Sequence, residues 1–145
     1  DVTPSKKDKN ENQNFHKILK NMCNRHNKKY YKKYKKWCDE YFYLPHRKEP
    51  RGIGGIFFDY KKDNFEKDFK FVRDVGVTFQ HIFNKIIKNK IKKKWSYKDK
   101  EMQYIKRGRY AEFNLLYDRG TKFGLETGGN VEGILMSLPP LAKWK

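Results

Sequence analysis

The sequence lacks the features that mark several large classes of protein. Its two cysteines, Cys23 and Cys38, lie outside any C-x-x-C pair, so we expect reduced, buried thiols and no disulfide framework. No run of about 18 apolar residues occurs, which argues against a membrane-spanning helix. The first residues show no signal-peptide pattern. Together these absences predict a cytoplasmic protein without a membrane span.

Common catalytic motifs are missing as well. The sequence has no P-loop, no G-x-S-x-G element and no Ser-His-Asp order, so neither nucleotide binding nor a serine nucleophile is indicated. His16 and His46 are thirty residues apart, outside any compact metal-ligand spacing. A lone histidine is usually a hydrogen-bonded structural residue, so spacing alone predicts no metal site.

What the sequence has in excess is positive charge. Lys and Arg number 35 against 17 Asp and Glu, a net charge of +18 over 145 residues, and aromatic residues make up 17% of the chain. This many aromatics predict a folded core in one domain or part of one. The charge predicts an anionic partner. Lysines between 85 and 94 suit a nucleic-acid-binding module, although such a run is more often a solvated helix end.

Arginine is the more informative cation, because its planar guanidinium binds carboxylates and phosphates in a bidentate manner that lysine cannot match. Most cations in this chain are lysines, so the arginines stand out. We interpret them as an indication of an anion site, with ordinary Arg–Asp pairing as the alternative. These residues are Arg47, Arg51, Arg107, Arg109 and Arg119.

Hydrophobic periodicity predicts an α+β protein in which helices cover a sheet. Apolar residues at i, i+3, i+4 and i+7 indicate a helix over 15–22, and aromatic residues on one face indicate a second over 29–44. Residues 53–60 are rich in β-branched and aromatic side chains and are predicted to form a strand. Further helices are expected over 64–90 and 97–107.

The prediction is organised around residues 107–128. With a period of two, this stretch is expected to form a strand, a tight turn at Arg119-Gly120 and a second strand. One face of the first strand is apolar, and the other carries Glu112, Asn114 and Asp118. The polar face is interpreted either as a solvated surface or as part of a site.

This stretch also resembles the oxygen-dependent coproporphyrinogen III oxidases of haem synthesis. From Arg107 onward it contains Arg-Gly-Arg-Tyr-x-Glu-Phe-Asn-Leu-x-Tyr-Asp-Arg-Gly-Thr-Lys-Phe-Gly-Leu. Further matches keep the order and spacing of the family over nearly the whole chain. They are Asp1-Val2-Thr3-Pro4, Phe15-His16, residues 35–42, His46-Arg47, residues 51–59 and residues 134–140.

The resemblance implies that residues 1–145 are the C-terminal portion of a single coproporphyrinogen oxidase domain. It implies a large, flat antiparallel sheet flanked by helices, working as a homodimer. The implied reaction converts two propionates of coproporphyrinogen III to vinyl groups, giving protoporphyrinogen IX. Dioxygen is the implied co-substrate, with carbon dioxide and peroxide as products. No organic cofactor is implied, and a divalent metal is a candidate because metal dependence is unsettled in the family.

The resemblance also implies three catalytic residues. Asp118 and Asp1 match acidic positions that hold the pyrrole N–H groups of the macrocycle and stabilise charge that develops during oxidation. Arg119, beside Asp118, is expected to bind a propionate. A substrate with four carboxylates needs several Arg and backbone N–H donors, which agrees with the anion site suggested by the arginines.

Other positions are carried over from the family in the same way. Gly128, Gly129 and Asn130 match a substrate-contacting Gly-Gly-Arg triplet, in which Asn130 replaces the arginine. His16 and His46 match two metal ligands of bacterial members, whose other ligands belong to the half of the family chain that is not in this sequence. That half also holds the proposed proton donor, so residues 1–145 alone are expected to be inactive.

The resemblance places dimer formation in the segment from Tyr110 to Lys145. His46, Tyr110, Glu112 and Asn114 are the residues expected to contribute to it. Two other hypotheses stay open at this point. One is the basic nucleic-acid-binding module suggested by the net charge and the interleaved aromatics. The other is an inactive relative that only dimerises, which the replacement at position 130 suggests.

Overall fold

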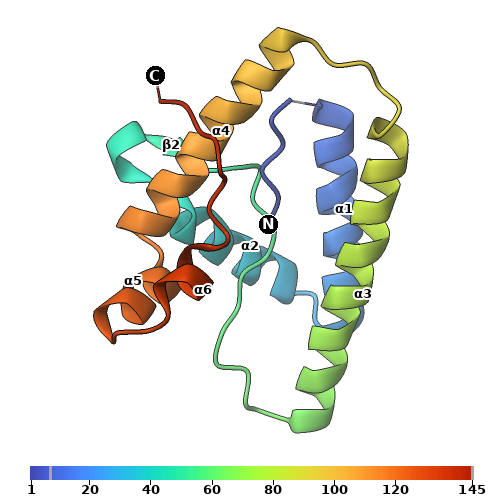
Figure 1. The fold of residues 1–145 in the computed structure, drawn as a ribbon. Coiled ribbons are helices and arrows are strands. Elements are labelled where there is room, and N and C mark those ends of the chain that lie inside the picture. The colour runs from blue at the N-terminus through green and yellow to red at the C-terminus, as the bar shows by residue number, and fades with distance from the viewer. Residues whose placement is uncertain (7, 145) are drawn as a thin grey trace.

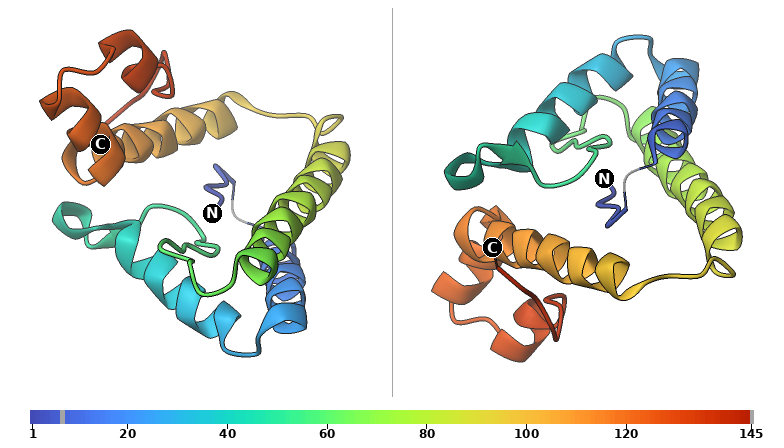
Figure 2. Two further views of the ribbon diagram at one scale, coloured as in Figure 1. Left: turned by 90° about the horizontal axis from the view of Figure 1, so that it is seen from below. Right: turned by 90° about the horizontal axis from the view of Figure 1, so that it is seen from above.

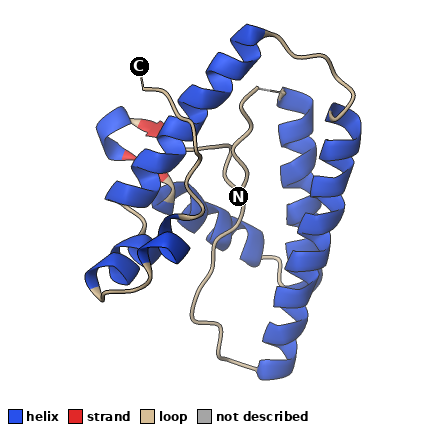
Figure 3. Ribbon diagram, viewed as in Figure 1, coloured by secondary structure: helices blue, strands red, loops and turns tan. Residues whose placement is uncertain are grey.

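The computed structural model describes residues 1–6 and 8–144, and most of them are helical (Figures 1 and 3). A two-stranded antiparallel sheet flanks a short 3-10 helix, η1 (Pro45–Arg47). The strands are β1 (Tyr43–Leu44) and β2 (Glu49–Pro50). The helices are α1 (Lys9–His26), α2 (Tyr30–Tyr41), α3 (Phe65–Lys90), α4 (Tyr97–Leu116), α5 (Arg119–Glu126) and α6 (Val131–Leu135).

The hydrophobic core lies between α1, α2 and α3. Figures 1 and 2 show α1 lying alongside α3, which continues past the end of α1 where α2 begins. Their apolar stripes meet, which confirms the helices predicted over 15–22, 29–44 and 64–90, the second of which ends at Tyr41. The buried core residues are Phe15, Leu19, Met22, Cys23, Tyr34, Phe71 and Ile82.

Both cysteines are buried and free, as predicted. Each is 0% exposed, and burial raises the pKa of Cys23 to about 11. A thiol with so high a pKa is not ionised near neutral pH, so it is a poor nucleophile and a poor metal ligand. The cysteines therefore act as small apolar residues of the interior.

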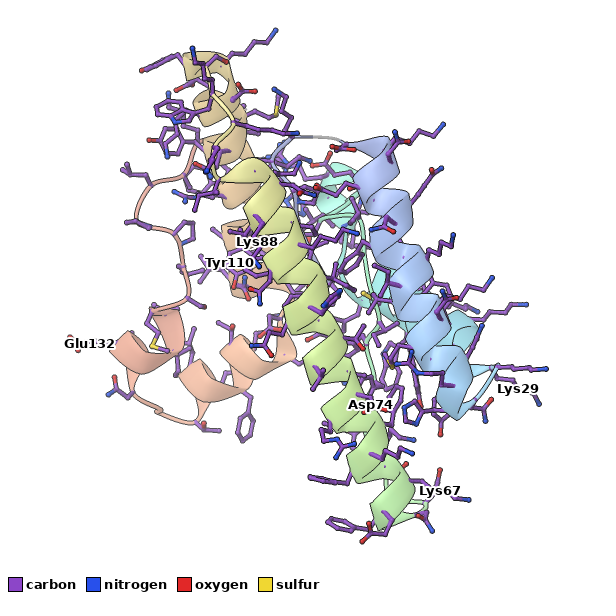
Figure 4. All side chains as sticks on the ribbon, turned by 90° about the vertical axis from the view of Figure 1, so that its right-hand side faces the viewer. Lys29, Lys67, Asp74, Lys88, Tyr110 and Glu132 are labelled. Carbon is purple, nitrogen blue, oxygen red and sulfur yellow. The ribbon has the colours of Figure 1, made fainter. Side chains whose placement is uncertain are left out.

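The contact between α1 and α3 also has a polar component. His26, near the end of α1, donates from Nε2 to Oδ2 of Asp74 on α3 at 2.9 Å. The same imidazole stands edge-on to the ring of Phe71, with centroids 5.2 Å apart. Figure 4 shows Asp74 between Lys67 and Lys88 along α3. This hydrogen bond fixes the two helices in register at the end where α2 begins.

The prediction of a strand over residues 53–60 is wrong. Within the described residues this segment makes one isolated bridge, in which Val2 donates to the carbonyl of Gly54 at 3.2 Å. Glycines let the chains approach closely, because a Cβ on Gly52 would lie 2.4 Å from the carbonyl oxygen of Val2. Gly54 has φ of +80°, a conformation outside the range of a strand. The segment is extended, but it has no continuous partner.

The β-hairpin predicted over residues 107–128 is wrong as well. Helix α4 continues to Leu116 and α5 starts at Arg119. A helix satisfies its own backbone hydrogen bonds, whereas a strand needs a pairing partner, and in the described part of the chain β1 and β2 pair with each other. Ser96 begins α4 with a capping box, exchanging hydrogen bonds with Asp99. The class is therefore α+β with a small sheet, and residues 1–6 and 8–144 form no large, flat sheet.

The C-terminal segment runs along α4, as Figure 1 shows. Lys143 donates its backbone N–H to the carbonyl of Tyr104 at 3.1 Å. A Cβ on Gly108 would lie 2.4 Å from the carbonyl oxygen of Lys143, so only glycine allows this approach. Gly108, Ala111 and Phe113 are the buried residues of α4.

We expect Phe71→Ala to destabilise the fold by about 3–5 kcal/mol, because it leaves a cavity among the core aromatic rings. Phe71 is 1% exposed, and its ring lies 5.0 Å from those of Tyr30 and Phe58. Phe69→Ala on the same helix is the control, since Phe69 is 57% exposed. Urea unfolding measures both free energies, and equal losses would contradict the assigned core.

Candidate active site

Asp118 is the N-cap of α5 and the centre of a hydrogen-bonded cluster. Its Oδ2 accepts from the backbone N–H of Thr121 at 2.7 Å and from the Thr121 hydroxyl at 2.9 Å. Its Oδ1 accepts from the hydroxyl of Tyr41 at 3.0 Å. The first bond is the usual role of an N-cap aspartate, which satisfies a free N–H in the first turn. The bond from Tyr41 joins the start of α5 to the end of α2.

The carboxyl of Asp118 is held in its ionised form. Partial burial acts to raise its pKa, but hydrogen bonds from Thr121 and Tyr41 and the positive charge of Arg51 outweigh burial and lower the pKa below its ordinary value. The α5 N-terminus also favours a negative charge at this position. Near neutral pH this cluster therefore presents a carboxylate that accepts hydrogen bonds.

Tyr41 connects Asp118 with its neighbour Arg119. The Tyr41 hydroxyl donates to Asp118 and accepts from the backbone N–H of Arg119 at 3.2 Å. The phenol ring stacks on Phe57, with centroids 4.5 Å apart and planes 10° apart. The sequence placed Tyr41 only on the apolar face of a helix. Its position at the end of that face, with a polar tip, was the signal for a second role.

The side chain of Arg119 is accessible. It is 58% exposed, its guanidinium carbon lies 5.1 Å from the centre of the Tyr41 ring, and Nη2 lies 3.4 Å from Oδ2 of Asp59. An exposed pair at this distance contributes little stability. Arg119 is therefore able to exchange Asp59 for another carboxylate at low cost.

Asp1 is paired with a deeply buried arginine. Oδ2 of Asp1 accepts from Nη2 of Arg51 at 2.6 Å, and the two side chains are 14% and 7% exposed. The guanidinium of Arg51 lies over the rings of Phe42, Phe113 and Tyr110, at 4.1, 4.7 and 5.3 Å from their centres. Burial is the main cause that lowers the pKa of Arg51, but a guanidinium stays charged in proteins.

Gly128, Gly129 and Asn130 form the turn between α5 and α6. Gly128 has φ of +72°, and Gly129 donates to the carbonyl of Gly124 at 2.9 Å, which closes the end of α5. The amide oxygen of Asn130 accepts from the backbone N–H of Gly133 at 3.2 Å and caps α6. Asn130 thus has a local structural role at this turn.

Glu112 is the hub of a second polar cluster. It accepts from Nε2 of His46 at 2.9 Å, from Nη2 of Arg47 at 2.6 Å and from Nη1 of Arg109 at 3.4 Å. Arg109 also donates from Nε to Glu49 at 2.6 Å. The hydrogen bonds from Arg47 are the main cause that lowers the pKa of Glu112. This cluster joins α4 to the turn between β1 and β2.

The four residues expected at a dimer interface make contacts within the chain. His46 bonds Glu112 through Nε2, and its Nδ1 lies 2.8 Å from the hydroxyl of Tyr117. Asn114 donates its side-chain amide to the backbone carbonyl of Tyr110 at 2.8 Å. These contacts neither require nor exclude a second subunit, so the dimer assignment stays a prediction.

His16 lies apart from His46 and has different partners. Its Nε2 donates to the carbonyl of Ile53 at 2.8 Å, and Nδ1 is 3.1 Å from the hydroxyl of Tyr31. A carbonyl only accepts, so Nε2 carries the proton and Nδ1 accepts from Tyr31. Burial is the main cause that lowers the pKa of His16, which favours the neutral ring. The structure does not bring the two histidines together.

Comparison with known proteins identifies the family. A family model described as coproporphyrinogen III oxidase matches residues 1–145. The chain belongs to the coproporphyrinogen III oxidase family. It is 57% identical to the oxygen-dependent coproporphyrinogen-III oxidases of Rickettsia rickettsii (strain Sheila Smith) and Rickettsia bellii (strain OSU 85-389), over 99% of this chain and 52% of each relative. That of Rickettsia akari (strain Hartford) is 56% identical over the same shares. The chain spans about half the length of these relatives.

Ion pairing within the chain accounts for most of the arginines that suggested an anion site. Arg47, Arg51, Arg109 and Arg119 each contact a carboxylate within the chain. The alternative of ordinary ion pairing therefore holds for these four in this structure. Arg119, the most exposed of them, is the one whose position still suits an external anion.

No helix in the described ranges is both long enough and apolar enough to cross a membrane.

We expect the charge of Asp118 to stabilise the folded chain only above acidic pH. Its pKa is lowered in the folded state, so this contribution is fully present above the unfolded value of roughly 4 and is lost as pH falls through the folded value. Asp118→Asn keeps a capping oxygen, whereas Asp118→Ala removes the cap at a cost of about 1 kcal/mol. Urea unfolding at pH 7 and pH 3 compares them, and a native–Asn difference that does not change with pH would contradict the assignment.

We expect Glu112→Gln to destabilise the chain by about 1–3 kcal/mol, because it leaves two arginines and a histidine without their shared carboxylate. The Glu112 side chain is 9% exposed. Glu40→Gln is the matched control, since Glu40 is 65% exposed and lies 3.7 Å from Lys36. The destabilisation caused by Glu40→Gln should stay below about 0.5 kcal/mol. Equal midpoints of thermal unfolding for the two variants would show that the cluster is not stabilising.

Proposed function

We propose that this chain is part of an oxygen-dependent coproporphyrinogen III oxidase and contributes to the conversion of coproporphyrinogen III to protoporphyrinogen IX. The observation that carries the proposal is the family match over residues 1–145, together with 57% identity to relatives of that name. These relatives are about twice as long as the chain, so the activity is proposed for the complete native protein.

The reaction requires a two-electron oxidant for each propionate. Each side chain loses its carboxyl group as carbon dioxide, and a carbon–carbon double bond forms as two electrons and a proton leave. Dioxygen takes these two electrons, this proton and one further proton from solvent and becomes hydrogen peroxide, so each propionate consumes one dioxygen and the complete conversion consumes two. The protein's task is to hold a polyanionic macrocycle and to stabilise positive charge that develops on it.

Asp118 is suited to accept from the pyrrole N–H groups. A carboxylate has about four lone-pair sites, and three are used by Tyr41 and Thr121. Oδ1, which accepts only from Tyr41, keeps one site for a substrate donor. Its ionised state also suits the stabilisation of an oxidised pyrrole. Arg119, exposed beside it, supplies a planar donor for a propionate.

The turn from Gly128 to Asn130 is proposed as a second contact with the substrate. The N–H groups of Gly128 and Gly129 donate to the carbonyls of Leu125 at 3.4 Å and Gly124 at 2.9 Å, so a substrate carboxylate would bind here by replacing such a bond. Asn130 provides an amide in place of the arginine of the family triplet, so it adds no charge to this contact. The grip on the carboxylate by backbone groups does not depend on that charge.

The metal assignment does not fit residues 1–6 and 8–144 by themselves. Among these residues no group of three or more His, Cys, Asp and Glu side chains is placed to hold an ion. Both nitrogens of His16, and both of His46, already have hydrogen-bond partners. Metal binding by these two histidines therefore stays a prediction.

Five further properties of the complete native protein also stay predictions. They are the single domain, the large flat sheet, the homodimer formed through Tyr110–Lys145, the cytoplasmic location and the absence of an organic cofactor.

The nucleic-acid alternative gains no observation from the structure. Lys90, in its lysine run, pairs with Glu11 at 2.8 Å, and Tyr34, in the aromatic stretch, belongs to the core.

We expect the complete native protein to convert coproporphyrinogen III to protoporphyrinogen IX in air and not under nitrogen, because dioxygen is the only oxidant proposed. Residues 1–145 alone should be inactive. Product is measured by porphyrin fluorescence after chemical oxidation, with a protein-free sample as control. Equal turnover under nitrogen would contradict the oxygen-dependent mechanism.

The same assay tests the site with Asp118→Ala. A loss of turnover in a protein that still unfolds cooperatively supports the assignment of Asp118, whereas unchanged turnover would reject it. If the native protein binds the substrate without turning it over, the inactive relative becomes the better description. Binding to nucleic acid that weakens steeply with salt, without porphyrinogen binding, would favour the basic module.

A further inference from the structure

Among the described residues, Arg51 stands out as a charged side chain in a buried position. It is 6% exposed, and its guanidinium lies within 6 Å of three aromatic rings. Its backbone N–H donates to the carbonyl of Phe42 at 3.0 Å, which fixes the start of the side chain. The Nε atom is buried and has no hydrogen-bond partner. A buried donor left without a partner is costly, so this arrangement is not explained by stability.

Within residues 1–6 and 8–144, the carboxylate in hydrogen-bond contact with this guanidinium is that of Asp1. The distance of 2.6 Å between Nη2 and Oδ2 is short, as expected for a charge-assisted bond in a dry site. Asp1 also lines a hollow of about 330 Å³ together with Phe15, Ile53 and Phe83. The residue thus has Arg51 on one side and an apolar hollow on another.

The second carboxylate affected by Arg51 is Asp118. The charge of Arg51 is one of the causes that lower the pKa of Asp118, although no hydrogen bond joins the two side chains. Arg51 thereby acts on both of the acidic residues proposed to hold the macrocycle. It does so from within the aromatic cage of Phe42, Tyr110 and Phe113, where water does not screen its charge.

We propose that Arg51 is a positioning residue, which holds the carboxylate of Asp1 in the orientation that the macrocycle requires. The inference rests on the proposed function. Arg51 itself is too deeply buried to touch the substrate, so it acts through Asp1. The aromatic cage restrains the flat guanidinium, and the guanidinium restrains Asp1.

A purely structural role makes a different prediction. Replacing a buried ion pair by apolar groups of similar size is often neutral for stability, because the cost of removing the charges from water disappears. The cage of Phe42, Tyr110 and Phe113 would accept a methionine in place of Arg51. The double variant Arg51→Met/Asp1→Asn should therefore fold, while the site loses its fixed carboxylate.

The test uses the complete native protein with coproporphyrinogen III in air. The variants are Asp1→Asn, Arg51→Lys, Arg51→Met and the double variant Arg51→Met/Asp1→Asn. Arg73→Met is the matched control, because Arg73 is 61% exposed and lies 3.7 Å from Asp74. The measurements are kcat, KM and the midpoint of thermal unfolding for each protein.

We expect Asp1→Asn and Arg51→Lys each to lower kcat/KM by between about 10-fold and 100-fold, as misplaced groups do. Lysine keeps the charge but loses the planar donors and the stacking, so it should not rescue activity. The double variant should be no worse than Asp1→Asn alone, because Arg51 acts through that residue. Arg73→Met should stay within about twofold of the native protein.

Three results would overturn the proposal. The first is native kcat/KM in Asp1→Asn or Arg51→Lys while Asp118→Ala is inactive, which leaves the proposed function intact. The second is an additive loss in the double variant, which would make Arg51 independent of Asp1. The third is a native protein without turnover, which overturns the proposed function as well. If Arg51→Met fails to unfold cooperatively, Asp1→Asn and Arg51→Lys decide the question.

Discussion

The contact that brings the distant segments of this structure together is the pair of Arg51 and Asp1 inside its aromatic cage. It joins three segments that are distant in sequence: the first residues, the chain that follows β2, and α4 through Tyr110 and Phe113. A buried guanidinium needs a carboxylate, and a flat cation favours aromatic faces. Both requirements are met at one point, which fixes how α4 lies against the end of α2.

The two parts of the molecule are held together by different forces. Between α1, α2 and α3 an apolar core provides the stability. Around α4 and α5 the polar contacts of Glu112, Asp118 and Tyr41 carry more of the structure. Directional contacts fix positions of charged groups more narrowly than apolar packing does, which suits a surface that must bind a polyanion. The proposed site lies in this second part.

The sequence was sufficient for much of the local structure. The α1, α2 and α3 helices follow from apolar residues at helical spacing, and Asn64 and Ser96 cap α3 and α4 as such residues commonly do. The strands at 53–60 and 107–128 were wrong, because short apolar runs fit a period of two and a period of 3.6 about equally well. A strand also needs a partner, and a local pattern does not show whether one is present.

The sequence by itself determined the family, the helices of the core and the identity of the acidic and basic residues at the site. These properties depend on the order of residues and on neighbours three or four positions apart. Only the tertiary structure decided which charges meet: Arg51 with Asp1, Glu112 with Arg47, and Asp118 with Tyr41. Ion pairs and hydrogen bonds act over a few ångströms, and residues fifty or more positions apart reach that distance only when the chain folds.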